Sequence, residues 1–238
     1  EPIGTLLFVA GITESMKLGQ TVLIMGYRLP VQTAKLIATL DVLSEGRAIL
    51  GAGIGWMREE FEVLGMPYDN RGKRADEQLE IFETLFNDET PSYDGEYYSF
   101  PDIKFEPKPL QDHVPVWIGG ASEPAFRRTA RFGDCFHAAF EPRDTVAKEW
   151  ERVCELTVEA GRSVDDMQLS IRLYLDPASA MKPELSIAGS TQQMIETMSG
   201  WKHIGVDHVL VDITAPGGPA ARLEAMQSFM TDVVPNVG

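Results

Sequence analysis

Pro115-Val116-Trp117-Ile118-Gly119-Gly120-Ala121-Ser122-Glu123-Pro124 is the stretch of this sequence that says most about the fold. Its first residues favour a buried β-strand, the two glycines favour a turn, and Ser122 can cap a helix that has Pro124 in its first turn. A strand that turns directly into a helix is the repeating unit of parallel α/β folds.

The same alternation of short β-rich runs and longer amphipathic runs continues in both directions from this stretch. The predicted strands are Leu18–Ile24, Ala48–Gly53, Val116–Gly119, Asp134–Ala138, Gln168–Leu175 and His208–Ile213. The predicted helices are Val31–Leu43, Gly72–Phe86, Pro124–Phe132, Thr145–Ala160, Thr191–Gly200 and Pro219–Asp232. Six strand–helix units therefore indicate a parallel sheet.

A helix predicted at Ile3–Ser15 precedes the first strand, so the sequence begins in the middle of a unit. Two architectures fit six units after a lone helix. One is a (β/α)8 barrel (TIM barrel) that lacks its first two strands in these residues, and the other is a complete six-stranded, doubly wound sheet. The periodicity alone favours neither.

The longest interruption lies at Asn87–His113, and its Tyr93-Asp94-Gly95-Glu96-Tyr97-Tyr98 run is typical of a β-hairpin. Too few apolar residues are present there to form a second core, so we expect one domain over residues 1–238 with a hairpin insertion at about 87–113. Ala178–Gly189 is long for a strand–helix connection and is expected to be a mobile loop.

Composition excludes several classes of function. The 36 acidic and 21 basic residues give a net charge of −15, which argues against nucleic acid as a partner. No apolar run is long enough to cross a membrane, and no secretory signal opens the sequence, so we expect a cytoplasmic protein. The two cysteines and four histidines have no metal-ligand spacing, so we expect no bound metal.

A phosphorylated ligand would need a local binding site on so acidic a protein. The main-chain N–H groups of Gly119, Gly120 and Ala121 after the strand residue Ile118, together with the Ser122 hydroxyl, would suit a phosphate, because helix N-termini stabilise anions. The alternative is a tight strand–helix turn with a capping serine.

The glycines of Gly51-Ala52-Gly53-Ile54-Gly55-Trp56 do not form a dinucleotide fingerprint, because Trp56 stands where that pattern needs glycine. Gly53 and Gly55 could let a flat ring lie against the strand end, or they could serve close helix-on-strand packing. Thr21 is a candidate ligand contact by its position near a strand end. His137, near the end of another strand, is a candidate for proton transfer, although a structural role is also open.

Several of these segments, in this order, resemble the luciferase-like oxidoreductases, and most closely the branch that uses the deazaflavin coenzyme F420. The segments that carry the resemblance are Leu18–Leu23, Tyr27–Pro30, Ala38–Ser44, Gly53–Trp56 with Glu60-Phe61, Tyr93–Tyr98 and Pro115–Gly120. The resemblance covers nearly the whole sequence from Pro2 to about Met230. It implies the (β/α)8 barrel, with its first two strands missing from these residues.

The resemblance also implies roles for particular residues. It implies a bulge with a non-proline cis peptide at Thr21–Val22 that backs the cofactor ring, a phosphate site at Ile118–Ser122, and a loop beside the ring at Gly53–Trp56. Two departures limit the transfer. The strand that often supplies an acid, histidine or aromatic residue is missing, and Trp56 replaces a glutamate proton donor of the sugar-phosphate dehydrogenases.

The leading hypothesis is hydride transfer between coenzyme F420 and a small organic substrate, in a protein that we expect to be a homodimer. An FMN-dependent luciferase-like monooxygenase is the alternative enzyme, because a phosphate site would serve either cofactor. A cofactor-binding relative without catalytic activity is the alternative from another class.

Overall fold

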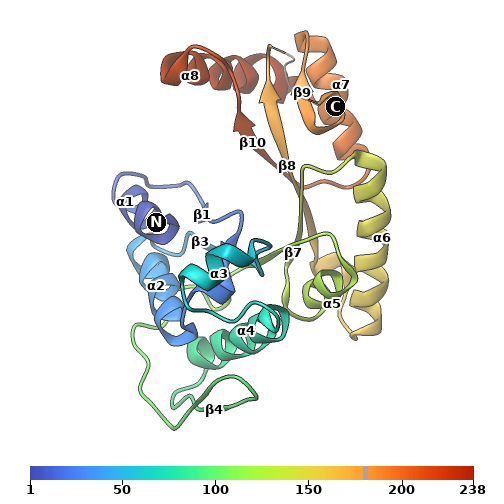
Figure 1. The fold of residues 1–238 in the computed structure, drawn as a ribbon. Helices are drawn as coiled ribbons and strands as arrows, with labels where there is room; N and C mark the ends of the chain where they lie inside the picture. Colours follow the sequence, from blue (N-terminus) through green and yellow to red (C-terminus); the bar gives the residue numbers. More distant parts are fainter. Residues whose placement is uncertain (179–181) are drawn as a thin grey trace. The chain divides into compact units, whose positions relative to one another are not determined.

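The computed structural model describes residues 1–178 and 182–238 (Figure 1). These form two compact units, of which the first contains residues 1–119 and 131–134 and the second contains residues 120–130 and 135–238. Apart from one antiparallel hairpin in the first unit, both units consist of parallel strands and helices in the alternating order that the sequence predicts. No helix in the described part of the chain is both long and apolar enough to cross a membrane.

The first unit is a parallel sheet covered by helices. Its helices are α1 (Pro2–Ala10), α2 (Pro30–Leu43), α3 (Arg58–Val63) and α4 (Arg71–Asn87). Its parallel strands are β1 (Leu18–Gly19), β2 (Leu23–Ile24), β3 (Ala48–Gly53) and β6 (Val116–Gly119), and β3 pairs with each of the other three. The core includes Leu50 and Ala52 of β3, Ile37 of α2 and Phe82 of α4. The predicted helix at Ile3–Ser15 is shorter than expected and ends at Ala10.

The predicted hairpin is present as β4 (Tyr93–Asp94) and β5 (Ser99–Phe100), which pair antiparallel. The long connection that follows it is anchored by Asp41, a fully buried residue of α2. Its carboxylate accepts hydrogen bonds from the backbone N–H groups of Leu110 and Gln111, at 2.8 and 3.0 Å, and from the Gln111 side chain. These bonds fix the chain immediately before β6 and so help to place the loop that follows β6.

The second unit contains most of α5 (Glu123–Phe132), and then continues from β7 to the end of the chain. Its further helices are α6 (Arg143–Glu159), α7 (Thr191–His203) and α8 (Gly218–Ser228). Its strands are β7 (Cys135–Ala139), β8 (Gln168–Asp176), β9 (Ser186–Ala188) and β10 (His208–Ile213), and β8 pairs parallel with the other three. Strand β9 lies inside the predicted loop Ala178–Gly189, of which residues 179–181 lie outside the described residues.

The two faces of β8 differ in chemistry. Leu169, Ile171, Leu173 and Leu175 are fully buried in the core, together with side chains of α6 and α7. Because successive side chains of a strand point to opposite faces, the residues between them face away from those helices. They are Ser170, Arg172 and Tyr174, and with Asp176 after Leu175 they form the polar face of β8.

Candidate functional site

The strand predicted at Leu18–Ile24 is interrupted by a bulge. Gly19 pairs with Ile49 of β3, and Leu23 pairs with Ala52. Three residues, 20 to 22, therefore stand opposite only two, 50 and 51, which is one residue too many for a regular ladder. The peptide bond Thr21–Val22 within this bulge is cis, as the family resemblance predicts. The side chains of both residues are half-buried.

The glycines of β3 make room for this bulge. A Cβ atom on Gly51 would stand 1.6 Å from the Gln20 carbonyl oxygen, and a Cβ atom on Gly53 would stand 2.3 Å from Cγ2 of Val22. Neither position can hold a side chain unless the bulge moves. The space beside these glycines is therefore filled by the bulge of the neighbouring strand, and not by a helix as in the helix-on-strand alternative. Gly53 contributes to the candidate site because its lack of a side chain leaves room for Val22.

Hydrogen bonds to two carbonyl oxygens hold the backbone of the loop after β3, whereas the large side chain of Trp56 in this loop is exposed. Gly55 has a φ of 72°, which favours glycine, and its carbonyl oxygen accepts a hydrogen bond from Nε of Arg71 at 3.0 Å. The Trp56 carbonyl oxygen accepts one from the Tyr68 hydroxyl at 2.9 Å. The Trp56 side chain is 75% exposed. The first unit thus brings Thr21, Val22 and Gly53 together, with Gly55 directly beyond the end of β3.

The turn between β6 and α5 contains the residues that the sequence predicts for a phosphate site. Gly120 has a φ of 133°, where a larger residue would be strained, and a Cβ atom there would stand 3.0 Å from Cβ of Ala125. Within the described residues, neither the N–H groups of Ala121 and Ser122 nor the Ser122 hydroxyl has a hydrogen-bond partner. These donors are exposed at the start of α5.

One carboxylate stands beside this turn, and its charge is balanced. Glu123 pairs with Arg127 at 2.7 Å and with Arg152 of α6 at 2.9 Å. The hydrogen bond from Arg152 is the largest of the effects that lower the pKa of Glu123. Arg152 also pairs with Glu155 at 2.7 Å and Glu159 at 3.7 Å, so the two guanidinium groups leave no excess positive charge beside the turn. An anion at Ala121 and Ser122 would therefore depend on the exposed N–H groups at the start of α5.

His137 lies on β7 and is 2% exposed. Its Nδ1 atom is 2.7 Å from Oγ of Ser170, the residue paired with it on β8. Burial, reinforced by the positive charge of Arg172, lowers the pKa of His137 to about 4. The imidazole is therefore neutral at neutral pH. A neutral histidine can exchange hydrogen bonds or accept a proton, but it does not supply a positive charge.

A second group of side chains stands at the carboxyl ends of β7 and β8. Phe140 directly follows β7 with a φ of 55°, which is unusual for a bulky residue. Its ring stacks on Tyr174 with a centroid distance of 4.4 Å and an interplanar angle of 23°. Cζ of Arg172 is 5.3 Å from the Phe140 ring centroid, and Arg172 is held by two-point hydrogen bonding to Asp212 of β10.

Sequence reasoning did not identify this aromatic group. A signal for Tyr174 and Arg172 was present in the alternation of β8, where every second residue from Gln168 to Asp176 is polar or aromatic. That pattern indicates a strand with one face away from the core. No comparable signal marked Phe140, because its contribution depends on a backbone conformation that residue type does not predict.

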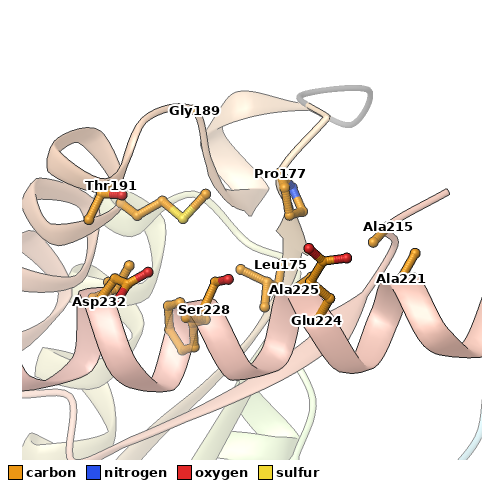
Figure 2. A pocket seen from close by; sticks show the side chains of 13 residues that line it. Leu175, Pro177, Gly189, Thr191, Ala215, Ala221, Glu224, Ala225, Ser228 and Asp232 are labelled. Carbon is orange, nitrogen blue, oxygen red and sulfur yellow. The ribbon is translucent and has the colours of Figure 1, made fainter. Parts of the chain in front are cut away.

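A cavity of about 300 Å³ lies elsewhere in the second unit, and Figure 2 shows the side chains around it. Leu175, Met194 and Phe229 supply apolar surface, and Glu224 and Asp232 of the C-terminal helical segment add carboxylates. None of the residues predicted from the sequence lines it. Among the described residues, no group of three or more histidine, cysteine or acidic side chains could hold a metal ion.

Known proteins resemble this chain in both sequence and structure. The model of a family described as luciferase-like monooxygenase matches residues 1–182. An uncharacterised protein of Mycobacterium tuberculosis is 33% identical over 155 residues, which are 65% of this chain and 53% of that protein. The chain therefore spans about half the length of this curated relative.

Two relatives have named activities. A 5,10-methylenetetrahydromethanopterin reductase of Archaeoglobus fulgidus is 34% identical over 155 residues, covering 64% of this chain and 45% of that protein. An FMNH2-dependent dimethylsulfone monooxygenase of Pseudomonas putida is 32% identical over 111 residues, covering 45% of this chain and 31% of that protein.

Solved structures share the fold at low identity. An F420-dependent secondary alcohol dehydrogenase in complex with an F420–acetone adduct superposes with a TM-score of 0.88 at 17% identity, covering 100% of this chain and 84% of that one. The coenzyme F420-dependent tetrahydromethanopterin reductase of Methanopyrus kandleri gives a TM-score of 0.85 at 19% identity, covering 100% and 88%. These likenesses show the luciferase-like barrel fold.

Proposed function

Because this chain belongs to the luciferase-like monooxygenase family, we propose that it is an oxidoreductase that transfers a hydride between coenzyme F420 and a small organic substrate. The observation that carries the proposal is the bulge at residues 20–22, which Gly51 and Gly53 accommodate. It presents the half-buried Val22 at the carboxyl end of the strands, which is the end where barrel enzymes bind their ligands.

The residues present suit a flavin-type nucleotide in two respects. Thr21 and Val22 offer a surface against which a flat ring can rest, with Gly55 beside it. The N–H groups of Gly119, Gly120 and Ala121, together with the Ser122 hydroxyl, would bind the phosphate, with Ile118 ending the strand beneath them. When bound, the cofactor ring supplies the hydride chemistry that no protein side chain provides.

His137 is the proposed catalytic residue. As a neutral imidazole positioned by Ser170, it would exchange a hydrogen bond with the substrate or accept a proton from it. Because His137 is 2% exposed, this role requires a substrate that reaches a buried side chain.

Coenzyme F420 is preferred over FMN for one reason. The reductase of Archaeoglobus fulgidus aligns with this chain over 155 residues and is named for a tetrahydromethanopterin derivative, as is the coenzyme F420-dependent reductase of Methanopyrus kandleri that shares the fold. The FMNH2-dependent monooxygenase aligns over 111 residues. FMN-dependent oxygenation is the second candidate function, and that monooxygenase is the observation that favours it. The phosphate site would serve both cofactors.

The proposal is tested by titrating the protein with coenzyme F420 and, separately, with FMN, and by following the visible absorbance of each cofactor. Ser122→Ala should weaken binding by about tenfold to a hundredfold, because a hydrogen bond to a charged group contributes roughly 1.5–3 kcal/mol. Gly120→Val should weaken it further, and its thermal melt must be measured because the backbone at Gly120 is strained for valine.

Ser190→Ala is the matched control, since it removes a capping hydroxyl from the start of α7 in the same unit. It should leave the affinity for both cofactors unchanged. Wild-type affinity in folded Ser122→Ala and Gly120→Val would place the phosphate elsewhere. Binding of neither cofactor by the wild-type chain would contradict the proposed function and also the third hypothesis, a cofactor-binding relative without catalytic activity.

A further inference from the structure

Tyr174 differs from every other tyrosine of the chain in its hydroxyl group. The hydroxyls of Tyr27 and Tyr93 bond to glutamates, that of Tyr68 bonds to a carbonyl oxygen, and that of Tyr98 is bonded by Gln78. The hydroxyl of Tyr97 bonds to Glu96, and this raises its pKa. Only the Tyr174 hydroxyl has no hydrogen-bond partner among the described residues, although the side chain is half-buried.

The ring that carries this hydroxyl is held in place from one side. Phe140 stacks on it at 4.4 Å and does so from a backbone conformation that is costly for a bulky residue. The Phe140 N–H donates to the Arg172 carbonyl oxygen at 3.0 Å, so the chain leaves β7 along the edge of β8. Backbone strain of this kind collects at ligand sites, because the surrounding contacts impose it.

The charges of Arg172 and Asp212, beside the stacked rings of Phe140 and Tyr174, largely cancel. Arg172 is bound at two points by the Asp212 carboxylate, at 2.9 and 2.8 Å, so the guanidinium is not offered to an anionic ligand as an isolated charge. The cluster of Phe140, Tyr174, Arg172 and Asp212 therefore combines aromatic surface, a neutral ion pair and one available hydroxyl. Such a surface recognises a flat, uncharged molecule that carries an oxygen acceptor.

We infer that Phe140 and Tyr174 form a substrate subsite for an aromatic or conjugated carbonyl compound. The Tyr174 hydroxyl donates a hydrogen bond to the substrate's carbonyl oxygen, and Phe140 is the positioning residue that fixes the Tyr174 ring. The inference rests on the proposed function, since it assigns the subsite to the substrate of that oxidoreductase. It is supported by the location of the pair at the carboxyl ends of β7 and β8, on the face of β8 away from α6 and α7.

The experiment measures binding of two probes by fluorine NMR, with the protein both free of cofactor and loaded with coenzyme F420. The probes are para-fluoroacetophenone and para-fluoroethylbenzene, which share the ring and differ in the carbonyl oxygen. Tyr174→Phe should raise the Kd of the ketone about fivefold to tenfold, which is the effect of one uncharged hydrogen bond. It should leave the Kd of para-fluoroethylbenzene unchanged.

The matched control is Tyr93→Phe, which removes a hydroxyl from the other stacked tyrosine–phenylalanine pair, Tyr93 with Phe100. It should change neither Kd. Phe140→Leu should weaken ketone binding, and Phe140→Tyr, which keeps the stacking ring, should restore it. A structural role of Phe140 alone would lower the melting temperature without separating the two probes.

The outcomes distinguish the two proposals. If coenzyme F420 binds to the wild type and Tyr174→Phe leaves ketone binding unchanged, the subsite is wrong and the proposed function stands. If neither F420 nor FMN binds, the proposed function fails, and the substrate assignment that rests on it falls as well. Failure of the wild-type chain to bind the ketone, or an equal loss in Tyr93→Phe, also overturns the subsite.

Discussion

At the scale of single residues, the contact between Val22 and Gly53 leaves no room for a side chain at position 53. Gly53→Ala would place a Cβ atom 2.3 Å from Cγ2 of Val22, so the bulge must shift. We expect a loss of about 1–3 kcal/mol in the free energy of unfolding, as overpacking usually costs, together with weaker cofactor binding. Urea unfolding and the absorbance titration measure the two effects.

Gly11→Ala is the control for this substitution, because its Cβ atom would meet its nearest neighbour at an ordinary 3.6 Å. It should leave cofactor affinity unchanged. A Gly53→Ala variant with the stability and cofactor affinity of the wild type would show that the bulge is not held by β3.

His137 makes stability depend on pH in a direction that the structure fixes. Its pKa is about 4 in the folded chain and 6.5 in the unfolded chain. Between these two pH values, His137 is mostly protonated in the unfolded chain and mostly neutral in the folded chain. Stability from this group is complete above pH 6.5 and is lost as the pH falls toward 4, by roughly 3 kcal/mol in all. His137→Gln should remove this part of the pH dependence of unfolding, whereas a change at the exposed His203 should not. Equal slopes in wild type and His137→Gln would contradict the assignment.

At the scale of elements, α7 offers the clearest test. The Ser190 hydroxyl accepts a hydrogen bond from the Gln193 N–H, and the Gln193 side chain accepts one from the Ser190 N–H, which completes a capping box. Ser190→Ala should lower the free energy of unfolding by about 1 kcal/mol. Chemical denaturation checks the value. A loss below the error of that measurement would mean that tertiary packing, and not the cap, fixes the start of α7.

Element positions were predictable from the sequence where one physical signal dominated. Strands β3, β6 and β10 have the predicted bounds, because each is a short apolar run between glycine or polar turns. The first predicted strand was wrong in its interior, since periodicity cannot show an inserted residue. Strand β9 was missed because Ser186–Ala188 is too short to show alternation. The cis bond at Thr21–Val22 came from the family resemblance and not from the composition of the bulge.

At the scale of the whole molecule, the sequence left two architectures open, and the family match over residues 1–182 together with the solved relatives identifies the luciferase-like barrel fold. Periodicity could not make that choice, because both architectures are built from the same strand–helix unit. The residues of the ring and phosphate sites remain predictions about function. Neither the homodimer nor the identity of the cofactor follows from the fold.

The central claim is that a flavin-type ring rests on Val22, and methyl NMR of valine-labelled protein tests it most directly. Spectra are recorded without ligand, with saturating coenzyme F420 and with saturating FMN. We predict that ring currents of the bound cofactor displace the Val22 methyl signals strongly, while those of Val63, which is 87% exposed on α3, stay in place. Cofactor bound with the Val22 methyl signals unmoved would contradict the account.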